Sequence, residues 1–155
     1  MIAACDAWVH ISEDDVWDEI EKRYDYRTPQ EHIQIKLKSI QHIEDALRSG
    51  KSVVFEFLVY EKPPVLVGAY QKLLRKRGIP FATKVLKPSV ETILKRQKER
   101  GRASEMNIER QRRNAELQLA CLDSDLIQPD WIVDSTGLSL NETYSLHFEK
   151  IVASQ

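Results

Sequence analysis

Short apolar runs alternate with longer segments of helical periodicity along this 155-residue chain, and this alternation constrains the fold more than any other feature. The apolar runs have the length and the β-branched content of buried strands. Strands that alternate with helices are typical of a parallel sheet covered by helices. We therefore expect an α/β fold with main strands near residues 8–12, 53–58, 81–86 and 131–134.

Capping signals mark where several helices begin. Thr28-Pro-Gln-Glu31 has the residues of a capping box with Pro at the first helical position, and Gly50 ends the helix that it opens. A second capping box, Ser139-Leu-Asn-Glu142, predicts a closing helix. Apolar stripes at helical spacing predict the buried faces of the helix after Thr28 and of a helix after Pro64. The stripes consist of Ile33, Leu37, Ile40 and Leu47 in the first helix and of Leu66, Ala69, Tyr70 and Leu73 in the second.

Size and charge limit the classes of protein to consider. The length suits one domain with a sizeable core, so we expect residues 1–155 to form a single domain. Charged residues make up 30% of the chain, but the net charge is only -1, so no overall field attracts it to nucleic acid or to an acidic membrane. No apolar run approaches the roughly 18 residues of a membrane span, and Met1-Ile-Ala-Ala-Cys5 lacks the basic start of a signal peptide. We expect a cytoplasmic protein without a membrane partner.

The cysteines and histidines do not indicate a metal site. Cys5 and Cys121 lack the C-x-x-C spacing of zinc ligands, so we expect two reduced thiols. The four histidines lack the i, i+4 spacing of a helical metal site, and we expect core or surface roles for them.

The sequence contains no nucleotide-binding loop of the Walker A type. Such a loop needs G-x-x-x-x-G-K-[ST] between a strand and a helix, because backbone N–H groups and a Lys hold the phosphates at the helix N-terminus. The nearest match is Gly50-Lys51-Ser52, but Asp45 stands where the first Gly is needed. These residues also follow a helix and lead into a strand. We therefore interpret them as a helix C-cap.

Three successive carboxylates, residues 13–15, follow the first expected strand. Open α/β sheets bind ligands at the carboxyl ends of their strands, so this position suits a site. Asp14 could act there as a general base or as a ligand of a Mg²⁺-bound water. Alternatively, the three acids are solvated at the start of a surface helix, where the helix dipole stabilises them and Ser12 caps the amide of Asp15. The residues alone leave both interpretations open.

Glu56 interrupts the apolar run from Val53 to Val59. A carboxylate inside a buried strand costs several kcal/mol unless it is paired or bound to a metal. A Lys or Arg on a covering helix would satisfy it as well as Mg²⁺ would, so a structural and a functional role stay open.

Residues 95–102 are the strongest local signal for an anion site. Arg96 and Arg100 lie one turn apart on one helical face, and Arg102 follows the break at Gly101, so their guanidinium groups could converge on one phosphate. A further helix from Glu105 would complete a pair of arginine-rich helices over residues 88–122. Acidic neighbours could instead make this a solvated basic surface. A nucleic-acid groove is disfavoured because residues 95–113 contain no aromatic side chain for base stacking.

Taken together, these segments resemble the small P-loop kinases, the group that contains polynucleotide kinase, gluconate kinase and chloramphenicol phosphotransferase. The similarity runs from Val9 to Phe148. His10-Ile-Ser-Glu-Asp-Asp-Val-Trp17 looks like the end of the second strand of that family. This implies that Asp14 is the base that accepts the proton of the substrate hydroxyl. The resemblance also places the neighbouring residues Glu13, Asp15 and Trp17 beside the substrate. Trp17 stands where polynucleotide kinase has Arg.

The same resemblance implies roles for later residues. Glu56 ends the strand that carries an acid near Mg²⁺. Arg96 and Arg100, with Arg102 beside them, are similar to the arginine lid that closes over the phosphates of ATP. The loop after the last strand resembles the loop that borders adenine, here Ser135, Thr136 and Gly137. ATP and Mg²⁺ are the implied cofactors.

The fold implied by the resemblance is a three-layer P-loop NTPase-like parallel sheet with flanking helices and strand order 2-3-1-4-5. Its first, central strand and its P-loop have no counterpart in these residues, and residues 2–7 look like the tail of the helix that follows the loop. Either the sequence is truncated, or the strands near residues 53 and 81 close the gap with a repacked core.

The implied function is ATP-dependent phosphotransfer to a small hydroxylated molecule, impaired without the P-loop. The alternative is a non-catalytic, degenerate kinase fold that binds an anion or a protein. A homo-oligomer, in which a second copy covers the open sheet edges, is a further expectation.

Overall fold

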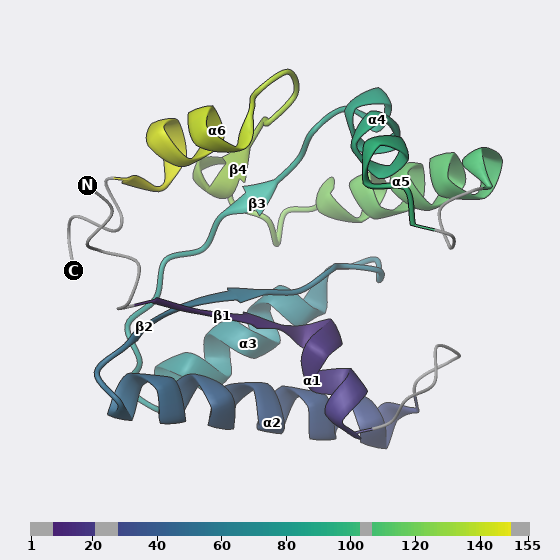
Figure 1. Ribbon diagram of the computed structural model, residues 1–155. Coiled ribbons are helices and arrows are strands. Elements are labelled where there is room, and N and C mark those ends of the chain that lie inside the picture. The colour runs from purple at the N-terminus through teal and green to yellow at the C-terminus, as the bar shows by residue number, and fades with distance from the viewer. Residues whose placement is uncertain (1–7, 21–27, 103–106, 150–155) are drawn as a thin grey trace. The chain divides into compact units, whose positions relative to one another are not determined.

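The computed structural model describes residues 8–20, 28–102 and 107–149 (Figure 1). The chain divides into two compact units, Met1–Leu58 and Val59–Gln155, and each is described by itself. Both units combine helices with short parallel strands, so the expected mixed α/β class is confirmed. The single-domain organisation stays a prediction. Cys5 and the expected helical tail at residues 2–7 lie outside the described residues.

In the part of the first unit that the structure describes, the chain forms one pair of strands and two helices. β1 (Trp8–Ser12) leads directly into α1 (Glu13–Ile20), and α2 (Pro29–Arg48) leads through Gly50 into β2 (Ser52–Glu56). The strands pair in parallel, with Trp8 opposite Ser52 and Ser12 opposite Glu56. The first strand has the predicted bounds, whereas the second ends two residues earlier than expected. Figure 1 shows α2 running along one face of the pair.

The start of α2 confirms the predicted capping box. The backbone N–H of Thr28 donates to Glu31 Oε2 at 2.6 Å, and the backbone N–H of Glu31 donates to Thr28 Oγ1 at 3.3 Å. Two N–H groups that the helix itself leaves unpaired are thus satisfied by side chains one turn away. This geometry depends on local sequence alone.

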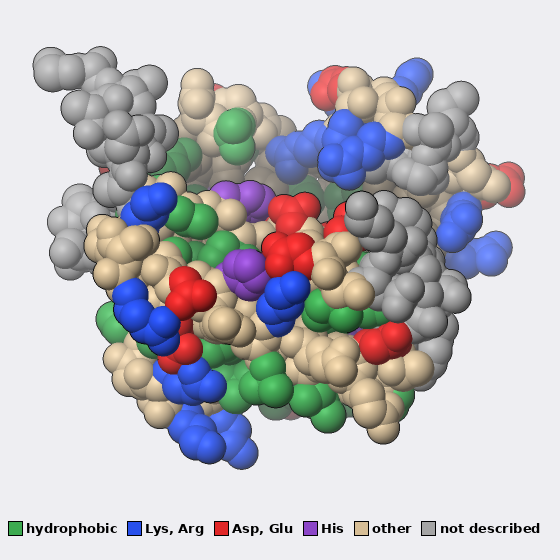
Figure 2. All heavy atoms as spheres, turned by 60° about the horizontal axis from the view of Figure 1, so that its bottom comes forward, with side chains coloured by type: hydrophobic (Ala, Val, Ile, Leu, Met, Phe, Trp, Pro, Cys, Tyr) green, Lys and Arg blue, Asp and Glu red, His purple; other side chains and the backbone are tan. Residues whose placement is uncertain are grey.

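The buried face of α2 is not the predicted stripe. Ile40 is buried as expected, but Ile33 and Leu37 are 54% and 51% exposed. The core side of the helix consists of Ile35, Ser39, Ile40 and Ile43. Because a polar residue, Ser39, stands in this row, hydrophobicity favoured the other stripe. Figure 2 shows exposed apolar side chains among charged ones on the side of the molecule that carries α2.

The described residues of the second unit form six main elements and a 3₁₀ turn at Pro129–Trp131. In chain order, they are α3 (Val65–Lys76), β3 (Val85–Leu86), α4 (Val90–Arg100), α5 (Ile108–Leu122), β4 (Ile132–Val133) and α6 (Leu140–His147). β3 and β4 pair in parallel, with Val85 opposite Ile132 and Leu86 opposite Val133. Both strands are shorter than predicted. Residues 81–84 are irregular and the 3₁₀ turn takes up residues 129–131, so only two residues of each apolar run have a partner for ladder hydrogen bonds.

The helices of this unit follow their capping signals. Ser89 Oγ accepts the backbone N–H of Thr92 at the start of α4, and Gly101 ends that helix with a φ of 67°. That left-handed conformation favours glycine. α5 begins at Ile108 with Asn107 as its cap, and residues 103–106, where we expected its first turn, lie outside the described residues. The two arginine-rich helices contact each other.

The buried face of α3 agrees with the prediction at Tyr70 only. Val67 and Gln71 are also buried, whereas Leu66, Ala69 and Leu73 are half-buried. The predicted stripe was therefore displaced by about one residue around the helix, a rotation of about 100°.

Strand pairing in the described residues gives two parallel pairs, β1–β2 and β3–β4, rather than one ladder of four strands. The parallel direction agrees with the prediction, whereas the three-layer sheet of the P-loop fold stays a prediction. Among the described helices, none has the length and apolar character needed to cross a membrane.

Candidate functional site

Two of the predicted site residues lie at the same end of the first strand pair. Ser12, the last residue of β1, is opposite Glu56, the last residue of β2. Asp14 follows two residues later in the first turn of α1, where its backbone N–H donates to Ser12 Oγ at 3.3 Å. Ser12 therefore caps the amide of Asp14 rather than that of Asp15. The carboxyl ends of β1 and β2 bring the candidate base and the candidate Mg²⁺ carboxylate to one edge.

The acidic turn separates into buried and exposed side chains. Glu13 and Trp17 are buried, together with Val16, whereas Asp14 and Asp15 are exposed. The helical period explains this pattern, since residues 13, 16 and 17 share one face of α1. Asp14 thus has the accessibility that a base needs. The substrate-binding roles of Glu13, Asp15 and Trp17 stay predictions, and the two buried residues contribute to the packing of α1.

Glu56 is not a buried charge, which corrects the premise of its sequence-based interpretation. Its side chain is 62% exposed, and Glu56 Oε1 lies 3.3 Å from His10 Nε2 on the neighbouring strand. Side chains alternate between the faces of a strand, so Glu56 shares the exposed face of the pair with His10 and Val54. Because the carboxylate is exposed to solvent, there is no cost of burial that a bound metal would have to offset.

Metal binding at this edge stays a prediction. Among residues 8–20, 28–102 and 107–149, no group of three His, Cys, Asp or Glu side chains is placed to hold a metal ion. Mg²⁺ in kinases is held by one or two carboxylates together with substrate phosphates, so Glu56 and Asp14 have the chemistry for such a site.

Arg96 joins α4 to the loop after β4. One of its terminal nitrogens donates to the carbonyl oxygens of Ser135 at 2.9 Å and Leu138 at 3.0 Å, and the other lies 3.4 Å from Ser135 Oγ. The structure thus brings together two residues that were predicted separately, the first lid arginine and the first residue of the adenine loop. The planar guanidinium suits this arrangement because its donors point in fixed directions.

The remainder of the loop is also held to the start of α4. The backbone N–H of Ser89 donates to Thr136 Oγ1 at 2.7 Å, and the backbone N–H of Thr136 donates to Asp134 Oδ1 at 2.9 Å. Hydrogen bonds from Thr136 hold the pKa of the Asp134 carboxyl below its ordinary value. Gly137 turns the chain with a φ of 73°, a conformation that favours glycine. The predicted adenine loop is therefore an ordered turn.

Arg100 and Arg102 lie at the end of α4, on either side of the glycine that terminates it, and both are exposed. Other charged residues of α4 form surface pairs, such as Glu91 with Arg112 of α5 at 3.1 Å. These pairs are what the solvated-surface interpretation expects. Convergence of the three predicted arginines on one phosphate stays a prediction.

The second unit contains a cavity of about 590 Å³ that was not predicted from the sequence. Its lining includes Lys84, Asp130 and Trp131, which come from two segments that are far apart in the sequence. Only the pairing of β3 with β4 brings them together. No spacing or motif marks such a set in advance.

Comparison of the chain with protein-family models, with curated proteins and with solved structures yields no match. The resemblance to small P-loop kinases therefore rests on the motifs quoted above and on their order.

Proposed function

We propose that this chain is a phosphotransferase of the P-loop kinase type, which transfers the γ-phosphoryl group of ATP to the hydroxyl of a small molecule. The pairing of its strands supports the proposal. In the strand order 2-3-1-4-5, the second strand pairs with the third and the fourth pairs with the fifth. β1 with β2 and β3 with β4 are the corresponding pairs, both parallel.

Asp14 is the general base in this proposal. Its carboxylate accepts the proton of the substrate hydroxyl as that oxygen forms a bond to the γ-phosphorus. The bond between the γ-phosphorus and the bridging oxygen breaks, and ADP leaves with the electron pair. Asp14 is exposed and lies two residues beyond the end of β1, which supports this role.

Arg96 is a positioning residue in this proposal, and Arg100 and Arg102 supply charge. Arg96 already donates to Ser135 and Leu138, so its guanidinium orients the loop that would border adenine. Arg100 and Arg102, at the exposed end of α4, would stabilise the negative charge of the transferring group. Bound Mg²⁺ would neutralise phosphate charge, and it would be held by Glu56 and, through a bound water, by Asp14.

The phosphate cradle is the missing part of such an enzyme, because these 155 residues contain no G-x-x-x-x-G-K-[ST] segment. The test begins with the gene upstream of Met1, where an in-frame segment of this type within about 30 residues would complete the strand–loop–helix unit. A polypeptide that includes it is then assayed with ATP, Mg²⁺ and a panel of nucleosides, sugars and aminoalcohols. Transfer to one acceptor class supports the proposal, and no transfer to any acceptor overturns it.

A second candidate function is a non-catalytic, kinase-like module that binds an anion or a protein. Two observations favour it. Arg96 donates to carbonyl oxygens and the Glu56 carboxylate lies beside His10, so both side chains have partners within the protein itself. If no P-loop segment exists upstream and ATP with Mg²⁺ does not bind, this function replaces the first.

A further inference from the structure

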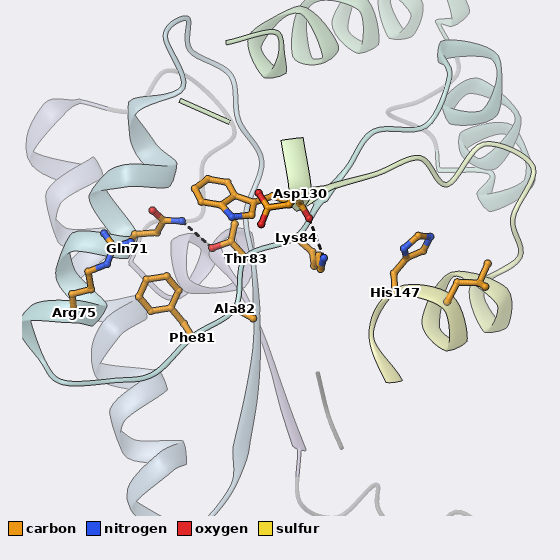
Figure 3. A pocket seen from close by; sticks show the side chains of 10 residues that line it. Gln71, Arg75, Phe81, Ala82, Thr83, Lys84, Asp130 and His147 are labelled. Atoms are coloured by element: carbon orange, nitrogen blue, oxygen red, sulfur yellow. Dashed lines mark hydrogen bonds between the residues drawn. The ribbon is translucent and has the colours of Figure 1, made fainter. Parts of the chain in front are cut away.

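The cavity of the second unit lies at the amino ends of β3 and β4 (Figure 3). Its walls are formed by α3, by residues 81–84 before β3, by Asp130 and Trp131 before β4, and by the end of α6. The loop with Ser135 and Thr136 follows β4 and so belongs to the opposite end of this strand pair. The cavity is therefore separate from the loop in the proposed kinase site.

Two cationic side chains line the cavity from different segments. Lys84 Nζ donates to the backbone carbonyl of Asp130 at 3.2 Å, which uses one of the three ammonium protons. The guanidinium carbon of Arg75, on α3, lies 5.3 Å from the centre of the Phe81 ring. Both cations are thus held in place by contacts with neutral groups, a carbonyl oxygen and an aromatic ring. The lining carboxylate, that of Asp130, offsets only one of them.

The cavity also offers aromatic surface on a fixed frame. Phe81 and Trp131 are half-buried, so part of each ring faces the opening. Gln71, which is buried on α3, donates from Nε2 to Thr83 Oγ1 at 2.9 Å. This bond fixes the irregular segment 81–84 against α3, and Figure 3 shows it on one side of the cavity. Aromatic rings beside oriented cations are the typical lining of a site for a small organic ligand.

We propose that this cavity binds a small organic anion with a planar ring. The ring packs against Trp131 and Phe81, and the anionic group, a phosphate or a carboxylate, accepts a hydrogen bond from Lys84, while Arg75 adds a second positive charge to the lining. The volume of about 590 Å³ suits a ligand of this size. The site requires neither ATP nor a P-loop, so this proposal can be tested independently of the kinase proposal.

The first test uses three probes with the full chain: 1-naphthyl phosphate, 1-naphthol and inorganic phosphate. Calorimetry is expected to give 1-naphthyl phosphate at least a tenfold higher affinity than either of the other two, because only it carries both ring and charge. Its binding should weaken with added salt and should shift the NMR signals of the Trp131 indole N–H and of residues 81–84. Equal affinity for 1-naphthol would overturn the proposal, as would shifts centred on Arg100 and Arg102.

Three substitutions sharpen the result. Lys84→Gln should weaken 1-naphthyl phosphate about tenfold, since a charge-assisted hydrogen bond is lost. Asp130→Asn should strengthen binding severalfold, because it removes the negative charge and keeps the backbone carbonyl that positions Lys84. Lys76→Gln, on α3 outside the cavity lining, is the control for loss of one positive charge and should leave the affinity unchanged.

An equal loss in Lys76→Gln and Lys84→Gln would mean general electrostatic attraction and would contradict the site. If Lys84→Gln does not fold by circular dichroism, Arg75→Gln takes its place. The salt and NMR results of the unsubstituted chain decide the question without either variant.

Discussion

Arg96 holds the loop after β4 through hydrogen bonds to Ser135 and Leu138. Arg96→Ala should lower the free energy of unfolding by about 2 kcal/mol, because hydrogen bonds from a charged donor are lost and the carbonyls lose their partner. Arg96→Lys should restore only part of this, since an ammonium lacks the planar fork. Urea denaturation measures both.

Arg102→Ala is the matched control, because Arg102 is exposed beyond the end of α4, and it should change stability by less than about 0.5 kcal/mol. Full stability of Arg96→Ala would show that the loop does not depend on this guanidinium. The guanidinium of Arg96 would then be available to bind phosphate, as the resemblance implies.

Asp14 and Asp15 are adjacent, exposed carboxylates with different predicted roles. In a polypeptide that contains a P-loop, Asp14→Asn should lower kcat by about 10²- to 10⁴-fold with little change in ATP affinity, because the base acts on the acceptor hydroxyl. Asp15→Asn is the control, and its kcat should change severalfold at most. Steady-state kinetics with the best acceptor distinguishes them. Full activity of Asp14→Asn would identify residues 13–15 as a solvated helix start.

At the scale of elements, α2 decides which of two apolar stripes forms the core of the first unit. Ile35 is fully buried and Leu37 is half exposed, although both are apolar and they lie only two positions apart along the helix. Ile35→Ala should therefore cost about 2–5 kcal/mol of unfolding free energy, and Leu37→Ala less than about 1 kcal/mol. Thermal or urea unfolding of the two variants measures the difference. A larger loss of unfolding free energy in Leu37→Ala than in Ile35→Ala would show that the buried face is the stripe that hydrophobicity alone predicts.

At the scale of the whole molecule, the absence of a Walker A motif from these residues limits nucleotide affinity. ATP with Mg²⁺ should bind the 155-residue chain no better than about millimolar, or roughly -4 kcal/mol, because arginines alone do not replace a backbone cradle and its Lys. Calorimetric titration tests this. Micromolar affinity would contradict it and would mean that another loop holds the phosphates.

Local sequence determined those parts of the protein whose physics is local. The capping box at Thr28 and the end of α4 at Gly101 were predictable because their hydrogen bonds and dihedral angles involve residues within one turn. The bounds of β1 followed from its apolar run, although its hydrogen bonds go to the distant strand β2. The mixed α/β class followed from the alternation of short apolar runs with segments of helical periodicity. The exposure of Asp14 next to a buried Glu13 follows from the same helical period once α1 is placed on its strand.

Tertiary structure alone decided the features that depend on distant partners. α2 buries the row with Ser39 because the strands lie on that side, and hydropathy carries no information about which side that is. β3 and β4 are two residues long because only that stretch meets a partner. Arg96 finds its acceptors about forty residues along the chain, as does Lys84 in the cavity, since a long side chain bonds to whatever the fold places within its reach.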